Sequence, residues 1–354
     1  MPGVSDSRWA AEGTTPSQIE SALREMLIER HAENESFTPA RVLNMVCIVD
    51  KAWSGEIANR LRLVGRYHAS RLVVLAVEPG RDRIDAVATI ASDVHPQPGE
   101  FALLRETVIV DVGERHLPGL ATIVDPLVVS DLPTVLWSPH GQPEAVDELL
   151  PLAQVVLLDS VDEPDLHEAL ERAAELAQKV YVVDLAWLRS TPWRERVAAT
   201  FDPANLRPDL RTISTVTIRH HPDSTAAALL LIGWLSSRLD WQPSKLIARN
   251  GGLVGKAHGR RQDVDLRIDP EPAQSVRGLA GLTLETASGR HLELDRGAGG
   301  LRAKYRNRKG DVREWTVLGA SRGEAGILGE GIRQALLRDP TYTPSLQVAN
   351  AILP

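Results

Sequence analysis

The sequence predicts an α/β protein in which a mostly parallel, Rossmann-like sheet domain is followed by a smaller α+β domain with an antiparallel sheet. Two observations support this prediction. Short apolar or β-branched runs alternate with helical stretches over the first two thirds of the chain, which is typical of parallel strands joined by crossover helices. Beyond residue 243, glycine becomes dense and short alternating runs replace that pattern.

The first domain is expected over residues 17–243, after a loose tail at 1–16 that is rich in small residues. Ser17 is expected to cap a first helix. Six apolar runs of strand length follow, at 42–49, 72–77, 107–112, 134–137, 155–158 and 180–183. Helical spacing marks 54–66 and 164–178, and the alternating segment 83–91 predicts an antiparallel edge strand. A last strand at 213–218 and an apolar helix at 226–239 complete this domain.

The second domain is expected over residues 244–354. Alternating runs predict antiparallel strands at 264–268, 281–286, 291–294, 301–307 and 314–318. A closing helix is expected at 322–338, before Asp339-Pro340. The glycine-rich segment 251–257 resembles a phosphate-binding loop, but it is one residue short and lacks a hydroxyl residue after Lys256. We interpret it as a flexible linker.

Composition limits the possible partners and compartment. Forty basic and forty-seven acidic side chains give a formal net charge of -7, which disfavours nucleic acid as a partner. The longest apolar run, at 226–235, is too short to cross a bilayer, so no membrane partner is expected. Cys47 is the single cysteine and lies in an apolar run, which excludes a disulfide framework and an internal dithiol switch. These features predict a cytoplasmic protein.

The motifs of common catalytic and cofactor sites are missing from the sequence. The turn after the first strand reads Lys51-Ala52-Trp53-Ser54-Gly55, without the glycine pattern that lets a pyrophosphate approach the backbone. No Gly-x-Ser-x-Gly nucleophile motif occurs. His220 and His221 are neighbours on a strand, so they point to opposite faces and cannot easily chelate one ion. We therefore predict no catalytic residue, no metal and no cofactor.

Tryptophan is unusually frequent, with eight tryptophans against three phenylalanines and four tyrosines. Trp137 ends a predicted strand, at the edge where open α/β sheets bind ligands. Trp187 and Trp193, with Arg194, lie near a helix start that Thr191 and Pro192 indicate. Because tryptophan and arginine are enriched at binding hot spots, these four side chains are candidate partner contacts. The equal alternative is that the tryptophans pack the core.

A second candidate contact surface lies in the second domain. Arg302, Lys304, Arg306 and Arg308 occupy alternate positions, so a strand at 301–307 would place them in one basic stripe. Such a stripe could dock an acidic protein surface or an anionic metabolite. An exposed edge strand that uses basic side chains against aggregation explains the pattern nearly as well.

Four motifs resemble those of the OpcA family of glucose-6-phosphate dehydrogenase assembly proteins. They are Tyr67-His68-Ala69-Ser70-Arg71, the run VVSDLPTVLW at 128–137, the pair DLAW and TPWR at 184–187 and 191–194, and the run GWLSSRLDW at 233–241. The resemblance is distinctive over about 41–241 and looser beyond. It implies a smaller carboxy-terminal domain and a non-enzymatic protein that binds glucose-6-phosphate dehydrogenase, the NADP-dependent entry to the oxidative pentose phosphate pathway. It also implies that the protein promotes oligomerisation or activation of the dehydrogenase.

Two other hypotheses remain open from the sequence. One is an enzyme or sensor that binds a sugar phosphate or a nicotinamide nucleotide at the carboxyl ends of the parallel strands. The other is a structural protein with a different target.

Overall fold

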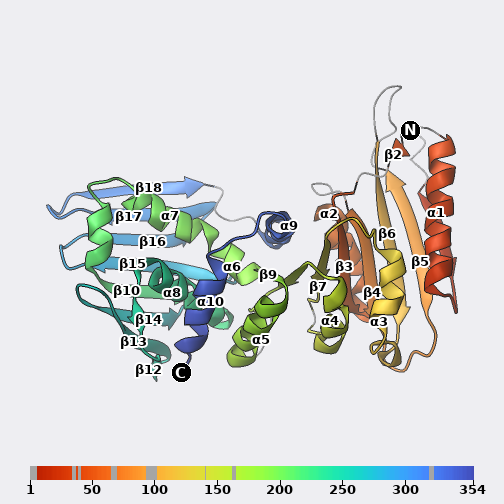
Figure 1. Ribbon diagram of the computed structural model, residues 1–354. Helices are drawn as coiled ribbons and strands as arrows, with labels where there is room; N and C mark the ends of the chain where they lie inside the picture. Colours follow the sequence, from red (N-terminus) through yellow and green to blue (C-terminus); the bar gives the residue numbers. More distant parts are fainter. Residues whose placement is uncertain are drawn as a thin grey trace. The chain divides into compact units, whose positions relative to one another are not determined.

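The computed structural model describes residues 6–33, 37–38, 41–64, 70–92, 102–139, 141–161, 165–318 and 323–354 (Figure 1). The chain divides into two compact units. The first comprises Met1–Leu158, Lys179–Val183 and Leu328–Leu337, and the second comprises Asp159–Gln178, Asp184–Ile327 and Arg338–Pro354. Among the described residues, two sheets of nine strands each are formed.

The first sheet is mostly parallel, as the sequence predicts. Its strands are β1 (Ser7–Ala11), β2 (Phe37–Thr38), β3 (Leu43–Asp50), β4 (Ser70–Val77), β5 (Asp85–Ser92), β6 (Ala102–Val112), β7 (Thr134–Trp137), β8 (Val155–Leu158) and β9 (Tyr181–Asp184). They follow the order β1-β5-β6-β4-β3-β7-β8-β9, with β2 beside β6. The pairs β3–β4, β4–β6, β3–β7 and β7–β8 are parallel. The order from β6 to β9 is that of a Rossmann-like sheet.

The helices of this part of the chain connect its parallel strands. They are α1 (Pro16–Glu33), α2 (Ser54–Val64), α3 (Leu120–Val124) and α4 (Pro143–Leu149), with short 3₁₀ turns η1 (Lys51–Trp53), η2 (Glu114–His116), η3 (Asp125–Leu127) and η4 (Leu150–Leu152). The first seven residues of β3 are all buried, as expected of a strand covered on both faces. An uninterrupted apolar run of this kind is what made the strand predictable.

The amino-terminal region departs from the prediction. Residues 7–11 are not a loose tail, because β1 pairs antiparallel with β5, and β5 is consequently not an edge strand. Residues 1–5 lie outside the described part of the chain. The helix begins at Pro16, and Thr15 rather than Ser17 caps it. The Thr15 hydroxyl accepts from the Gln18 amide at 3.4 Å, while the Gln18 side-chain oxygen accepts from the Thr15 amide at 3.0 Å.

The second sheet is antiparallel except at one pair. Its strands are β10 (Ile213–His220), β11 (Gln242–Pro243), β12 (Ile247–Arg249), β13 (Gly252–His258), β14 (Asp263–Pro270), β15 (Leu279–Thr286), β16 (His291–Gly297), β17 (Gly300–Arg306) and β18 (Val312–Leu318). Their order is β11-β13-β14-β10-β15-β16-β17-β18, with β12 beside β13. Only β10 and β14, among the described pairs, run parallel.

Helices cover one face of this sheet. The helical segments of this region are α5 (Leu166–Lys179), α6 (Leu185–Arg189), α7 (Thr191–Phe201), η5 (Arg207–Thr212), η6 (Pro222–Ser224), α8 (Thr225–Leu239) and α10 (Tyr342–Ala351). Helix α9 (Gly323–Ala335) follows β18 in the chain, but most of it belongs to the first unit. Figure 1 shows α7, α8 and α10 in front of the sheet, and α8 contacts β10 and β14. Side chains along β14 alternate between exposed and buried, so the opposite face of the sheet is open.

The structure divides the chain at a different place from the sequence interpretation. The strand expected to end the first sheet is β10, which lies between β14 and β15 in the second sheet. The chain divides near residue 158, and the expected boundary at 243 falls inside the second unit. Consequently the second unit is not a smaller appendage. Side chains of β10 are alternately buried and partly exposed, as expected of a strand with one open face rather than of a central parallel strand.

The glycine-rich segment expected to be a linker forms β13. A Cβ at Gly252 would lie 2.5 Å from the Ile268 carbonyl oxygen, and one at Gly255 would lie 2.6 Å from a methyl carbon of Leu246. Glycine is therefore dense here because neighbouring chain segments pack closely, not because the segment is flexible.

Helix α9 agrees with the predicted closing helix, whose first residue, Arg322, lies outside the described part of the chain. Helix α10 was not predicted. Among the described helices, none is both long and apolar enough to cross a membrane.

Candidate functional site

The predicted tryptophan contacts lie in the interior. Trp137, Trp187 and Trp193 are 3%, 2% and 1% exposed, and Arg194 is 8% exposed. The Arg194 guanidinium stacks over the Trp187 ring, 3.5 Å from its centre, and donates to the Ser190 hydroxyl at 3.1 Å. The structure thus favours the alternative in which these tryptophans pack the core.

A partly buried ion pair completes the Trp187 cluster. The Asp339 carboxylate accepts from the Trp187 indole at 2.9 Å and lies 3.4 Å from Arg194. Burial lowers the pKa of Arg194 to about 10. Burial alone would raise the pKa of Asp339, but hydrogen bonds from Thr341 and from the indole bring it below its ordinary value. Arg194 therefore anchors the fold instead of projecting toward a partner.

A second buried network surrounds Asp184, at the end of β9. Its carboxylate accepts from the Ala186 amide at 2.9 Å, the Ser160 amide at 3.2 Å and the Tyr342 hydroxyl at 3.2 Å, and it also contacts the Ser160 hydroxyl. Burial and the nearby charge of Asp159 raise the pKa of Asp184 to about 6, against the effect of these hydrogen bonds. The network holds three segments of the second unit together.

The basic stripe is exposed on β17, but it contains three of its four expected members. Arg302, Lys304 and Arg306 are exposed on the open face of the sheet. Arg308 follows the strand and pairs instead with the buried carboxylate of Asp209 at 2.5 Å. A turn at residues 307–311 ends the alternation, which is why Arg308 leaves the stripe.

Charges of both signs alternate across the open face. Lys304 lies in register between Glu293 and Glu314, and it pairs with Glu314 at 3.3 Å. Arg302 and Arg306 have no ion-pair partner among the described residues. The open face therefore offers two guanidinium groups that can bind carboxylates of another molecule.

The turn after β3, where a Rossmann-like fold holds a dinucleotide, is occupied by the chain's own polar contacts. The carboxylate of Asp50 accepts from the Gln142 side chain at 2.7 Å. Lys51 is engaged by the carboxylate of Asp111. Nearby Cys47 is fully buried, which raises the pKa of its thiol well above its ordinary value. A carboxylate at this turn disfavours a pyrophosphate.

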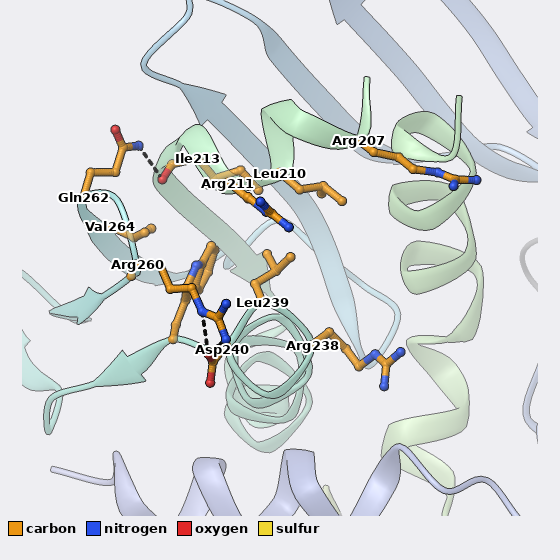
Figure 2. A pocket seen from close by; sticks show the side chains of 12 residues that line it. Arg207, Leu210, Arg211, Ile213, Arg238, Leu239, Asp240, Arg260, Gln262 and Val264 are labelled. Carbon is orange, nitrogen blue, oxygen red and sulfur yellow. Dashed lines mark hydrogen bonds and ion pairs between the residues drawn. The ribbon is translucent and has the colours of Figure 1, made fainter. Parts of the chain in front are cut away.

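An arginine-lined pocket in the second unit was not anticipated by the sequence interpretation. Its cavity of about 390 Å³ is bounded by η5, by the carboxyl end of α8 and by the β13–β14 turn (Figure 2). Four arginines and one aspartate contribute its charged lining: Arg207, Arg211, Arg238, Arg260 and Asp240. These residues are far apart along the chain, so no local motif signals the pocket.

Two of the four arginines are already neutralised. Arg260 pairs with Asp240 at 2.7 Å, and Arg207 pairs with Asp202 at 2.8 Å. Neither Arg211 nor Arg238 has an ion-pair partner in the part of the chain that the structure describes. Figure 2 shows the two side chains extending from η5 and from α8, respectively. The pocket therefore carries uncompensated positive charge.

Comparison with known proteins decides the family. Residues 62–175 match a family model described as glucose-6-phosphate dehydrogenase subunit N-terminal domain, and residues 180–346 match one described as the C-terminal domain of that subunit. The chain belongs to the OpcA family. This membership confirms the resemblance in the sequence motifs, of which residues 67–69 lie outside the described part of the structure.

Similar OpcA proteins occur in cyanobacteria, where their names assign them provisionally to the OxPP cycle. The Nostoc punctiforme protein is 27% identical over 237 residues, which are 64% of this chain and 50% of that protein. The Synechococcus elongatus protein is 28% identical over 183 residues, or 51% of this chain and 41% of that protein. The chain thus spans about half the length, or less, of these curated relatives.

Similar solved structures are dehydrogenases. A scyllo-inositol dehydrogenase from Lactobacillus casei matches with a TM-score of 0.46 and 11% identity, covering 89% of this chain and 96% of that chain. The WlbA dehydrogenase from Thermus thermophilus matches with a TM-score of 0.44 and 13% identity, covering 88% of this chain and 94% of that chain.

Proposed function

We propose that this OpcA-family chain is a non-enzymatic partner of glucose-6-phosphate dehydrogenase that favours the active assembly of the dehydrogenase in the oxidative pentose phosphate pathway. The observation that carries the proposal is the pair of family models, both described as domains of a glucose-6-phosphate dehydrogenase subunit, at 62–175 and 180–346. The occupied turn after β3 agrees with it, because this part of the chain is not shaped for a dinucleotide.

The proposed mechanism needs binding alone. A partner that contacts the active assembly more tightly than the inactive one shifts the equilibrium by the ratio of its two affinities. Each tenfold difference in affinity is about 1.4 kcal/mol. No group of this chain has to react with the substrate of the dehydrogenase.

The open face of the second sheet is our proposed contact surface. Arg302 and Arg306 present guanidinium groups without an internal ion pair among the described residues, and these groups can each bind a carboxylate through two hydrogen bonds. An acidic patch on the dehydrogenase is the complementary partner surface. Trp187, Trp193 and Arg194, which are buried, support this face indirectly by keeping the second unit folded.

The first test measures turnover of the dehydrogenase, and its mass by light scattering, with and without an equimolar amount of this protein. We expect turnover to rise and a larger particle containing both chains to form. If neither quantity changes over a range of NADP and glucose 6-phosphate concentrations, the proposed function is wrong.

A charge reversal tests the contact surface. Arg306→Glu places a carboxylate opposite the acidic partner surface, and we expect at least about a tenfold loss of affinity because like charges at an interface cost several kcal/mol. Arg249→Glu is the matched control. Arg249 is also exposed, but it lies on β12, near the opposite edge of the sheet from β17. Circular dichroism checks that both variants fold. Equal affinities for the two variants would remove the β17 surface from the proposal.

A further inference from the structure

The arginine-lined pocket has the charge of an anion-binding site. The two internal ion pairs neutralise Arg260 and Arg207, which leaves Arg211 and Arg238 to set the charge of the cavity. The carboxyl end of α8 contributes about half a negative charge. The remaining charge of the pocket lining is positive. The magnitude of this charge matches a ligand that carries between one and two negative charges.

The lining also fits the carbon skeleton of a small molecule. Leu210, Ile213, Leu239, Trp241 and Val264 supply apolar surface beside the guanidinium groups. A cavity of about 390 Å³ falls in the size range of small-molecule sites, about 300–1,000 Å³. A concave site of this size is better suited to binding a free metabolite than to binding a flat surface of another protein.

Contacts within the protein hold the wall of the pocket in place, so a ligand does not have to order this wall when it binds. The Gln262 side-chain amide donates to the carbonyl oxygens of Thr212 and Ile213, both at 2.7 Å. This ties the β13–β14 turn to the end of η5. A Cβ at Gly259 would lie 2.9 Å from the Gln262 carbonyl oxygen and 3.2 Å from the Trp241 ring, so glycine allows the turn to pack closely. Such preorganisation favours binding because little chain entropy is lost.

We propose that this pocket binds the phosphoryl group of a small phosphorylated metabolite, for which Arg211 and Arg238, both exposed in its lining, supply the positive charge. A phosphate monoester carries about -1.5 to -2 charges at neutral pH and accepts paired hydrogen bonds from guanidinium groups. The site is separate from the stripe on β17 and from the turn after β3. The inference does not rest on the proposed function, since it concerns a ligand of the chain by itself.

The test is calorimetric titration of the isolated chain with glucose 6-phosphate, inorganic phosphate and glucose. We expect glucose 6-phosphate and inorganic phosphate to bind and glucose not to bind. Arg211→Gln and Arg238→Gln should each weaken phosphate binding at least about tenfold, since each removes a charge-assisted pair of hydrogen bonds. Arg249→Gln, with the same charge change on β12, should leave the affinity unchanged.

A variant of opposite effect sharpens the test. Asp240→Asn frees Arg260 from its ion pair, so phosphate should bind several-fold more tightly. Asp240 has a φ of 57°, and asparagine tolerates this left-handed conformation, so the end of α8 should be preserved. Thermal unfolding without ligand verifies that all four variants are folded.

Two results would overturn the proposal. One is that neither phosphate probe binds. The other is that both bind with an affinity that Arg211→Gln and Arg238→Gln leave unchanged, which would locate the phosphate elsewhere, for example at the carboxyl ends of the parallel strands.

Discussion

Asp184 makes the stability of the second unit depend on pH. Its folded-state pKa of about 6 lies above its ordinary value of 3.8, because burial and the charge of Asp159 disfavour the ionised form. The folded protein therefore binds this proton more tightly than the unfolded chain. The stabilisation is fully present below about pH 4 and is lost as the pH rises through 6, a change on the order of 3 kcal/mol.

Asp184→Asn tests this prediction, because asparagine does not titrate. The variant loses hydrogen bonds by an amount that does not depend on pH, so the informative quantity is the stability difference between the two proteins. We expect wild type to lose stability relative to the variant between about pH 4 and pH 7, measured by urea unfolding. An equal difference at the two ends of this range would contradict the assigned shift.

Individual residues show which side-chain environments the sequence can predict and which it cannot. Tryptophan enrichment at Trp187 and Trp193 has the same appearance whether the side chains face a partner or the core, since both environments favour large aromatic rings. Only the tertiary structure shows Arg194 stacked on Trp187 and paired with Asp339, a residue distant in sequence. The exposed positions of Arg302, Lys304 and Arg306 were predictable, because alternation along a strand fixes which face each side chain takes.

At the scale of elements, the close contact between α8 and α10 depends on a glycine, which has no side chain. A Cβ at Gly233, in the middle of α8, would lie 2.1 Å from the carbonyl oxygen of Ser345 on α10. Gly233→Ala should therefore force the two helices apart and destabilise the protein by about 1–3 kcal/mol, as overpacked core substitutions do. Thermal unfolding measures the effect.

The same substitution at Gly55 is the control. Gly55 lies in α2, and a Cβ at this position would have no neighbouring atom within 4 Å, so alanine adds helix propensity without a clash. We expect Gly55→Ala to stabilise the protein by about 0.5–1 kcal/mol. If Gly233→Ala were as mild as Gly55→Ala, the helices would not be held at the observed separation.

The sequence predicts whether a segment is a helix or a strand better than it predicts which strands pair with each other. Strands β7 and β8 begin and end where their apolar runs do. The sequence also predicts a strand at β10. Periodicity does not indicate which sheet a strand joins, however, and β10 pairs with β14 and β15 in the second sheet. For the same reason the pocket was not predicted: its walls come from segments around 207–213, 238–241 and 259–264, which only the fold brings together.

At the scale of the whole molecule, charge is distributed unevenly. The chain has a net charge of -7, yet Arg302, Lys304 and Arg306 share one exposed strand, and Arg211 and Arg238 share one pocket. An overall negative charge keeps non-specific anion binding weak, while local positive charge still attracts acidic surfaces. Net charge by itself therefore does not show where a smaller anion could bind.

This distribution predicts that the proposed association with glucose-6-phosphate dehydrogenase depends on salt. The electrostatic screening length falls from about 10 Å at 0.1 M salt to about 3 Å at 1 M, so charges on the β17 face should guide encounter only at low salt. We expect the association rate constant, measured by surface plasmon resonance, to fall steeply over this range while the dissociation rate constant changes less.

The variants separate this face from the rest of the charged surface. Arg306→Glu should lower the association rate at low salt and flatten its salt dependence, because it removes part of the field that salt screens. Arg249→Glu makes the same change of charge away from β17, so it should keep the steep dependence of wild type. An association rate that is independent of salt in wild type would mean that apolar contacts guide the encounter, and the charged face of β17 would then not be the docking surface.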